Sequence, residues 1–245
     1  MHKKLVVSNH NSDLEWLSMT YDYGFSPDNT IIYDRSDEEK DWSHLGESLR
    51  SSNVGENIYD IMRFIVEHYD NLPDVSIFIK GNLFQRPEEH GGENYYTTKE
   101  RFIQALHTDK FFSIWVDKWI ALGDHRHFRY APEETLAEGR LVQPIQDCDF
   151  RYNTHHQNRY FTSTHELWNW CFVDPPKQNS IEFIPANNFA VPKENILQYS
   201  KDLYEKIQSI LYEPDPPYDR TCAEAHLLER TFYFMWSNNL VERKD

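Results

Sequence analysis

The chain has 245 residues, enough for one large domain or two small ones with a substantial core. Aromatic residues make up 15% of it, which argues against disorder because such side chains need a folded interior. The net charge of −15 repels nucleic acid and anionic membranes, so we expect neither as a partner.

The cysteines and the apolar runs indicate a compartment. Cys148, Cys171 and Cys222 are widely spaced and form no Cys-x-x-Cys pair, which favours a reducing environment. The N-terminal apolar run at residues 5–7 is too short for a signal peptide. No apolar stretch approaches the roughly 20 residues that span a bilayer. We therefore expect a cytoplasmic protein without a transmembrane segment.

The first part of the chain alternates between apolar runs typical of strands and segments typical of helices. In chain order, we expect a strand at 5–8, a helix at 13–17, a strand at 30–34, a polar surface segment with one helical turn at 37–52, a helix at 56–70 and a strand at 75–79. Pro73 follows the helix at 56–70 and cannot continue it. This alternation predicts a mostly parallel central sheet in a three-layer α/β/α sandwich.

The remainder of the chain has a looser pattern. In chain order, we expect a helix at 98–106, a polar aromatic loop at 123–130, a strand at 141–145, a strand at 181–184, a helix that starts at Pro192 and runs to about residue 211, and a last helix at about 221–236. No internal repeat or linker interrupts the chain, which favours a single domain over residues 1–245.

Polar corners follow the three strands of the first part. They are Asn9-His10-Asn11, Asp34-Arg35 and Lys80-Gly81-Asn82. The carboxyl ends of parallel strands lie at one edge of a sheet, where ligands of α/β proteins bind. Asn53 and Gly55 lie at the start of the helix at 56–70, and helix packing could place them at this edge or at the opposite one. Ordinary turn chemistry explains each corner singly as well.

Asp147 and Asp149 have the Asp-x-Asp spacing that can hold a divalent metal on a diphosphate. Alternate residues of an extended segment face the same way, so both carboxylates could ligate one ion. The pattern also arises by chance, because the chain has 40 acidic residues.

A second candidate metal site consists of Asp124, His125 and His127, with His155 and His156 as further imidazoles. Imidazole and carboxylate groups could bind zinc or a similar ion. No His-Glu-x-x-His motif accompanies them, and histidines in surface loops explain the same pattern.

Glu229 lies among apolar residues in the last expected helix. Burial there would raise its pKa and suit a general base. A pairing with Arg230 or His226 is the alternative.

Several segments resemble motifs of a family of largely uncharacterised proteins. Val6–Leu17 is similar to a strand followed by "YNEDLxWL", Asn53–Glu56 to "NxGRE" and Ile65–Asp74 to the start of "YDxLPDxxxFLQG". Asn188–Glu194 is similar to "QFAVSRE", and Leu228–Arg230 to the start of "LERLW". These segments span most of the chain.

That family resembles compact glycosyltransferases of the GT-A type. The resemblance implies a nucleotide-binding half at about 1–83 and an acceptor-binding half at about 84–245. It implies a nucleotide-sugar donor, with UDP the commonest nucleotide, and a glycan or other hydroxyl acceptor. The implied nucleotide-binding residues are Asn9, His10, Asp34, Asn53, Gly55, Lys80, Gly81 and Asn82.

The resemblance leaves the use of a metal open. Lys80-Gly81-Asn82 occupies the strand end where many GT-A enzymes carry Asp-x-Asp. Mn²⁺ or Mg²⁺ could instead be held by Asp147 and Asp149. Alternatively, Lys or Arg could neutralise the leaving diphosphate without a metal.

An inverting transfer also requires a carboxylate that deprotonates the acceptor hydroxyl. By this resemblance, Glu229 is the first candidate and Asp149 the second. The implied acceptor-binding residues are Asn187, Asn188 and Phe189. Two other functions remain open: a metal-dependent hydrolase built on the cluster at 124–127, and a non-catalytic glycan-binding module.

Overall fold

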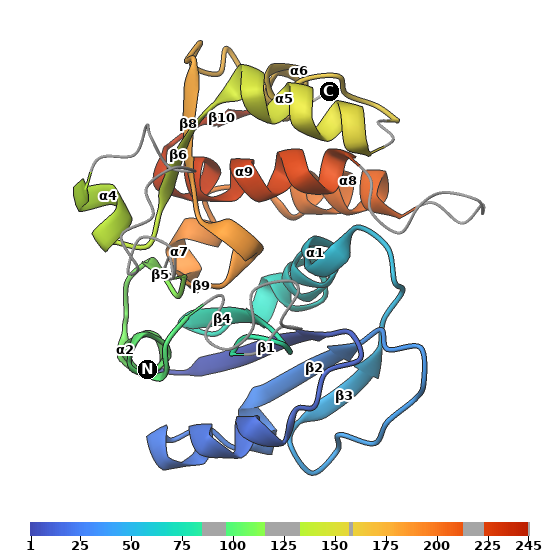
Figure 1. Ribbon diagram of the computed structural model, residues 1–245, viewed down its shortest axis with the longest axis vertical. Helices are drawn as coiled ribbons and strands as arrows, with labels where there is room; N and C mark the ends of the chain where they lie inside the picture. The colour runs from blue at the N-terminus through green and yellow to red at the C-terminus, as the bar shows by residue number, and fades with distance from the viewer. Residues whose placement is uncertain (85–96, 116–132, 157–158, 213–222, 245) are drawn as a thin grey trace.

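The computed structural model describes residues 1–84, 97–115, 133–156, 159–212 and 223–244. Within these ranges the protein is a single α/β domain built on a mostly parallel central sheet, as predicted (Figure 1). Its strand order is β3 (Glu47–Arg50), β2 (Thr30–Asp34), β1 (Lys3–Asn9), β4 (Val75–Lys80), β9 (Phe189–Pro192) and β5 (Phe112–Ser113). Strands β3, β2, β1 and β4 are parallel, whereas β9 is antiparallel to both β4 and β5.

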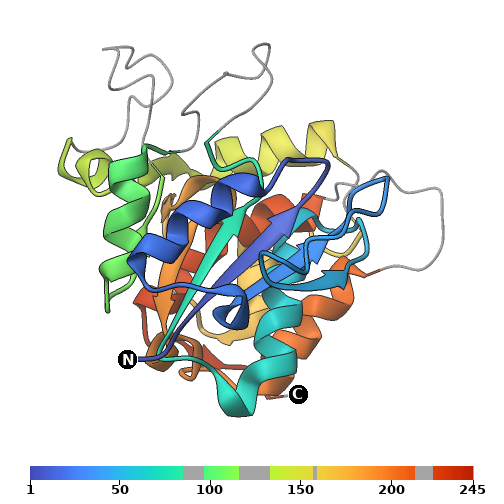
Figure 2. The same ribbon diagram turned by 90° about the horizontal axis from the view of Figure 1, so that it is seen from below.

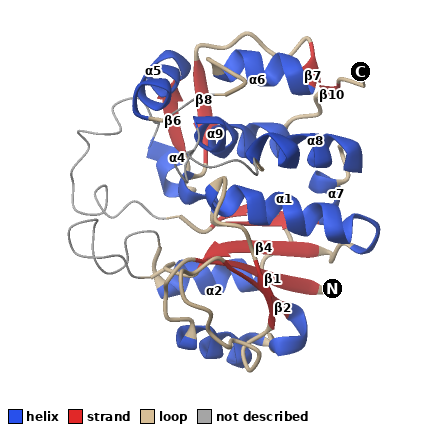
Figure 3. Ribbon diagram, turned by 90° about the vertical axis from the view of Figure 1, so that its right-hand side faces the viewer, coloured by secondary structure: helices blue, strands red, loops and turns tan. Residues whose placement is uncertain are grey.

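Helices cover both faces of this sheet. One face carries α1 (Glu56–His68), with α8 (Lys201–Leu211) and α9 (Ala223–Ser237) packed behind it (Figure 3). The opposite face carries the 3₁₀ helix η1 (Glu15–Tyr23) and α2 (Lys99–His107), which lie across the strands when the molecule is seen from below (Figure 2).

A further group of elements lies on the far side of α9 from the sheet (Figures 1 and 3). It contains the antiparallel pair β6 (Leu141–Pro144) and β8 (Ser180–Phe183) and the helices α5 (Ile145–His155) and α6 (Thr164–Cys171), and the short helix α4 (Glu133–Ala137) precedes β6 in the chain. Strands β7 (Phe172–Val173) and β10 (Val241–Glu242) also pair. One hydrophobic cluster runs through sheet and helices, which is why the two halves form one domain.

Three sequence expectations were wrong in detail. The polar segment at 37–52 contains β3, an edge strand whose side chains are mostly exposed, so it lacks an apolar signal. The helix expected at 13–17 is the 3₁₀ helix η1. The helix expected from Pro192 is two helices, α7 (Lys193–Ile196) and α8, and Ser200 caps the second by accepting a hydrogen bond from the Leu203 N–H.

No helix among the described ranges is long and apolar enough to cross a bilayer.

Candidate functional site

The N-terminus of α1 lies at the carboxyl edge of the sheet, and β3 is the reason. The chain leaves the parallel strand β3 at Arg50, at this edge, and enters α1 at Glu56 only a few residues later. Asn53 thereby lies beside the end of β1, and its Nδ2 is 3.1 Å from Nε2 of His10. The two segments that the sequence could not place together therefore meet.

Lys80 joins the end of β4 to the start of α1. Its Nζ lies 3.6 Å from Oε2 of Glu56, and only 17% of the Lys80 side chain is exposed. The Lys80 ammonium is the main cause of a lowered pKa at Glu56, and it outweighs the opposing effect of burial. Glu56 is therefore ionised at neutral pH.

Gly55 shapes the first turn of α1. It is the N-cap residue, with a left-handed φ of 57°, and no side chain caps the helix there. A Cβ at Gly55 would lie 3.0 Å from Cβ of Leu211, so a larger residue would press against α8. An α-helix N-terminus without a side-chain cap presents backbone N–H groups and a partial positive charge.

Asn9 and Asp34 are buried, with 0% and 3% exposure, so the expectation that they contact a nucleoside is corrected. The Asn9 amide donates to Oδ1 of Asp34 at 3.2 Å, and the Ser36 N–H donates to the same oxygen at 3.1 Å. These hydrogen bonds connect the loops that follow β1 and β2 and hold them together. His10 and Asn53 are half-buried and reach the surface at this corner, and Asn11 is exposed.

The Lys80-Gly81 corner is held from three sides. The Lys80 N–H donates to Oδ1 of Asn188 at 2.8 Å, and the Trp16 indole donates to the carbonyl of Gly81 at 2.9 Å. A Cβ at Gly81 would lie 2.3 Å from Oδ1 of Asn9, so only glycine fits. Asn82, next in the chain, is half-buried.

Phe189 belongs to the core, so the expectation that it binds an acceptor is wrong. It is 1% exposed, and its ring centroid lies 5.9 Å from that of Phe78 and 5.5 Å from that of Trp236. Asn187 and Asn188 are also buried, with 1% and 0% exposure, and cannot line an open acceptor surface.

The turn η5 (Pro185–Asn187) before β9 has an unusual backbone. Ala186 and Asn187 both have positive φ, 62° and 55°, a conformation that costs energy in residues other than glycine. The Asn57 amide of α1 donates to the carbonyl of Ala186 at 3.1 Å. Glu229 of α9 accepts from the Ala186 N–H at 2.6 Å. Contacts from two helices thus hold this turn in its strained form.

Glu229 is paired rather than isolated. Its Oε2 bonds the Arg230 guanidinium, and Nδ1 of His226 lies 3.8 Å away. Burial alone would raise the pKa of Glu229, but Arg230, His226 and Lys80 outweigh it and hold the pKa far below its usual value. The pairing with Arg230 and His226 is therefore present and keeps Glu229 ionised, in place of the raised pKa expected from burial alone.

Arg35 and Asp60 form a buried ion pair beneath this edge of the sheet. The amino-acid sequence alone did not indicate this pair. Nε of Arg35 lies 3.8 Å from Oδ2 of Asp60, and Ser51 bonds the other carboxylate oxygen. Burial raises the pKa of Asp60 to about 6, more than Arg35 and Ser51 lower it. Asn57 and Asp60 are three residues apart and lie on the buried face of α1. Two polar residues on an otherwise apolar helix face are the sequence signal that could have indicated this buried polar cluster.

The Asp-x-Asp pair is not extended. Asp147 and Asp149 lie in α5. An α-helix turns by about 100° per residue, so two residues at this spacing lie on nearly opposite faces of the helix. Oδ1 of Asp149 accepts from the backbone and the hydroxyl of Thr164 at 2.8 and 2.6 Å. The geometry expected of a shared metal ligand pair is therefore absent, and α9 separates these residues from the sheet (Figure 3).

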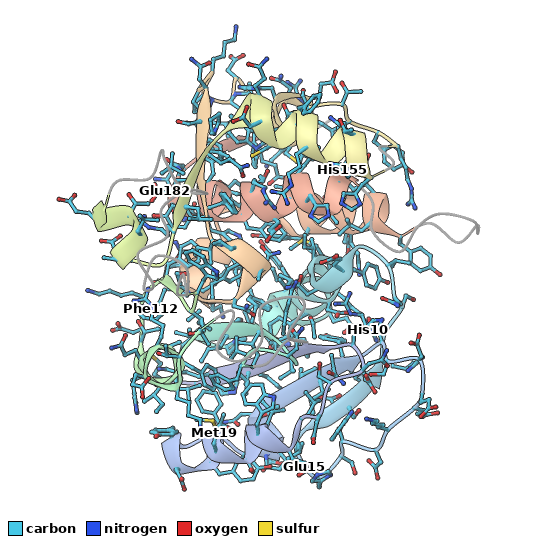
Figure 4. All side chains as sticks on the ribbon, viewed as in Figure 1. His10, Glu15, Met19, Phe112, His155 and Glu182 are labelled. Atoms are coloured by element: carbon cyan, nitrogen blue, oxygen red, sulfur yellow. The ribbon has the colours of Figure 1, made fainter. Side chains whose placement is uncertain are left out.

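Within the described ranges, no group of three or more His, Cys, Asp or Glu side chains could hold a metal ion. Asp124, His125 and His127 lie outside those ranges. His155 is exposed at the end of α5, on the same side of the molecule as His10 in the view of Figure 4. The ring of His156 lies 4.4 Å from that of His226.

A family model described as "Protein of unknown function (DUF3431)" matches residues 5–245. No match was found among the curated proteins or among the solved structures.

Proposed function

This chain belongs to the DUF3431 family, described as proteins of unknown function, and we propose that it is a glycosyltransferase. It would transfer a sugar from a nucleotide-sugar donor, with a UDP-sugar favoured, to a hydroxyl group of a glycan or similar acceptor. The α/β architecture with a parallel sheet in the first half supports a fold of the GT-A type, with the nucleotide at the carboxyl edge.

The observation that carries the proposal is the meeting of Lys80 with the N-terminus of α1 at that edge. A diphosphate needs positive charge and hydrogen-bond donors, and a helix N-terminus offers both. The Lys80 ammonium would bind the phosphates as a point charge. Glu56 would have to release Lys80, and its side chain, 37% exposed, can turn toward solvent.

His10 and Asn53 would contact the nucleoside, because they reach the surface beside this helix terminus. Asn9, Asp34, Gly81 and Asn188 would act indirectly by holding the three strand corners in place. This division differs from the sequence expectation, which gave all of them direct contacts.

In the proposed reaction, the acceptor oxygen attacks the anomeric carbon of the donor sugar. The bond from that carbon to the phosphate oxygen breaks, and the nucleoside diphosphate leaves with the electron pair. Lys80 and the α1 terminus stabilise its charge. Glu229 is the carboxylate we assign to accept the acceptor proton, because it binds the Ala186 N–H, and the Ala186 carbonyl in turn binds Asn57 in the first turn of α1. Asp149 is not assigned, since α9 lies between it and the sheet.

Thermal-shift measurements with UDP, GDP and CMP, each with and without Mn²⁺, test this proposal. We expect one nucleotide, UDP first, to raise the melting temperature. Lys80→Met should weaken its binding by about 10- to 100-fold, the range for losing a hydrogen bond to a charged group. Lys201→Met is the matched control, because Lys201 also pairs with a glutamate, at 3.9 Å, but lies on α8.

A dependence of the shift on Mn²⁺ would show that metal contributes to donor binding, and an unchanged shift would favour the metal-independent form. If none of the three nucleotides stabilises the protein, or if Lys80→Met and Lys201→Met bind equally well, the proposal fails. A glycan-binding module without nucleotide affinity would give the first of these results.

A further inference from the structure

A large open groove lies on the far side of α9 from the proposed donor site, against α5 and the start of α6. Its volume is about 950 Å³, at the upper end of the roughly 300–1,000 Å³ typical of ligand clefts. Residues of α5 form one wall, and the segments before α6 and β8 form the others.

The groove has a fixed frame. Asp149 binds the backbone and hydroxyl of Thr164, and the Asn153 amide donates to the carbonyl of Thr162. Thr162 is itself held by Glu166, which accepts from its N–H at 2.6 Å. These contacts tie α5 to the start of α6, so the wall residues are positioned in advance of any ligand. A preformed frame reduces the entropy that binding costs.

The groove offers hydrogen-bonding groups of a particular kind. Its described lining contains carboxylates, amides and hydroxyls but no lysine or arginine. Asp147, Gln146 and Asn179 are exposed, and Oδ1 of Asn153 is buried without a hydrogen-bond partner among the described residues. Such a set suits a ligand with many hydroxyl groups and disfavours an anion.

Phe150 adds an apolar surface to this polar groove. It is 74% exposed, the highest exposure among the described large hydrophobic side chains, and it stands on α5 between Asp147 and Asn153. A single exposed aromatic side chain is unremarkable on a plain surface. Here its ring lies among convergent polar groups, and it can stack on the C–H face of a sugar while those groups bind the hydroxyls.

We propose that this groove binds a neutral oligosaccharide, with Phe150 as the stacking platform and Asp147 and the amide side chains as partners of the sugar hydroxyls. This groove is separate from the proposed donor site. Oligosaccharide binding in the groove can therefore be tested independently of glycosyl transfer. Metal ions and cationic peptides fit less well, because Asp149 is already bonded to Thr164 and the remaining polar lining is mostly uncharged.

Ligand-observed saturation-transfer NMR with cellotetraose, maltotetraose, chitotetraose and mannotetraose tests the site. We expect at least one of them to bind and Phe150→Ala to weaken it at least about tenfold. Tyr160→Ala is the matched control, since Tyr160 is 53% exposed but does not line the groove. It should change affinity by less than about twofold.

Asp147→Ala provides a second variant at an exposed position and should weaken binding at least about threefold. Binding should be similar in low and in high salt, because the ligand is neutral. No transfer from any of the four sugars, equal losses in the Phe150 and Tyr160 variants, or binding abolished by salt would overturn the proposal. Because nucleotide binding is measured separately, failure here leaves the Lys80 result unaffected.

Discussion

Asp60 shows how one residue near the site makes stability depend on pH. Its carboxyl is fully buried under the edge of the sheet, and burial raises its pKa from 3.8 to about 6. The folded protein therefore holds this proton more tightly than the unfolded chain does. The resulting stabilisation is complete below about pH 3.8 and is lost as the pH rises through about 6.

We accordingly expect Asp60→Asn to remove this dependence. Relative to the wild type, the variant should gain unfolding free energy as the pH rises from about 4 to 7, by an amount on the order of 3 kcal/mol. Urea unfolding at several pH values measures the difference, with Asp70→Asn at an exposed position as control. A carboxyl carbon NMR signal of Asp60 that titrates near pH 4 would contradict the expectation.

Several residues of the site could be predicted individually, but their roles could not. Polar types at strand ends and a glycine before a helix are local signals, so the sequence alone makes His10, Asn53 and Lys80 candidates. Asn9 and Asp34 carry the same signal, yet they lie buried and bond each other, 25 positions apart. Burial depends on distant partners, and no local pattern shows it.

At the scale of elements, the strand β3 and the turn η5 set the geometry of the candidate site. β3 brings the start of α1 to the carboxyl edge, and η5 brings the start of β9 beside the end of β4. The turn depends on α9, because Glu229 accepts from the N–H of Ala186, whose φ is 62°. An ion pair with Arg230 holds that carboxylate in place.

Glu229→Gln separates the two roles assigned to this residue. Loss of the charge leaves the 7%-exposed Arg230 without its carboxylate, so we expect a destabilisation of about 3 kcal/mol in urea unfolding. Glu205→Gln, on the surface of α8 and paired with Lys201, should cost less than about 1 kcal/mol.

If Glu229 is also the base, the folded variant loses glycosyl transfer but retains nucleotide affinity. Full turnover in a destabilised variant would show that Glu229 only holds the turn η5 and pairs with Arg230. Wild-type stability together with full turnover would remove both roles.

For the whole molecule, the central sheet couples the two halves of the chain. β9 and β5 come from the second half, yet they extend the sheet formed by the first. Phe189 lies at this junction, against Phe78 of β4 and Trp236 of α9. The nucleotide and acceptor halves implied by the resemblance therefore share one core.

We expect unfolding in urea to give coincident transitions by far-UV circular dichroism and by tryptophan fluorescence. Phe189→Ala should shift both transitions equally, by about 3 to 5 kcal/mol, because it leaves a cavity in the shared core. Phe150→Ala removes the same side chain from a 74%-exposed position and should shift neither measurably. Two separate transitions, or a shift of only one probe, would show that the halves unfold independently.

The amino-acid sequence by itself determined the strands β1, β2 and β4, the helix α1 and the polar corners after these strands. Their signals are local. The periodicity of apolar residues, the prolines that end helices and the polar residues at strand ends can each be recognised within a few residues. The fold class followed from their order. β3 carries no such signal, because the side chains of this exposed edge strand are polar, and the spacing of Asp147 and Asp149 predicted an extended segment although both residues lie in α5.

Only the tertiary structure decided which polar residues at the strand ends face solvent and which are buried and hydrogen-bond one another. It placed Asn53 beside His10 and Lys80 beside Glu56, and it buried Phe189 in the core. It also paired Glu229 with Arg230, a choice that the sequence left open. These outcomes depend on strand pairing and helix packing between segments far apart in the chain, and such contacts have no counterpart in local sequence pattern.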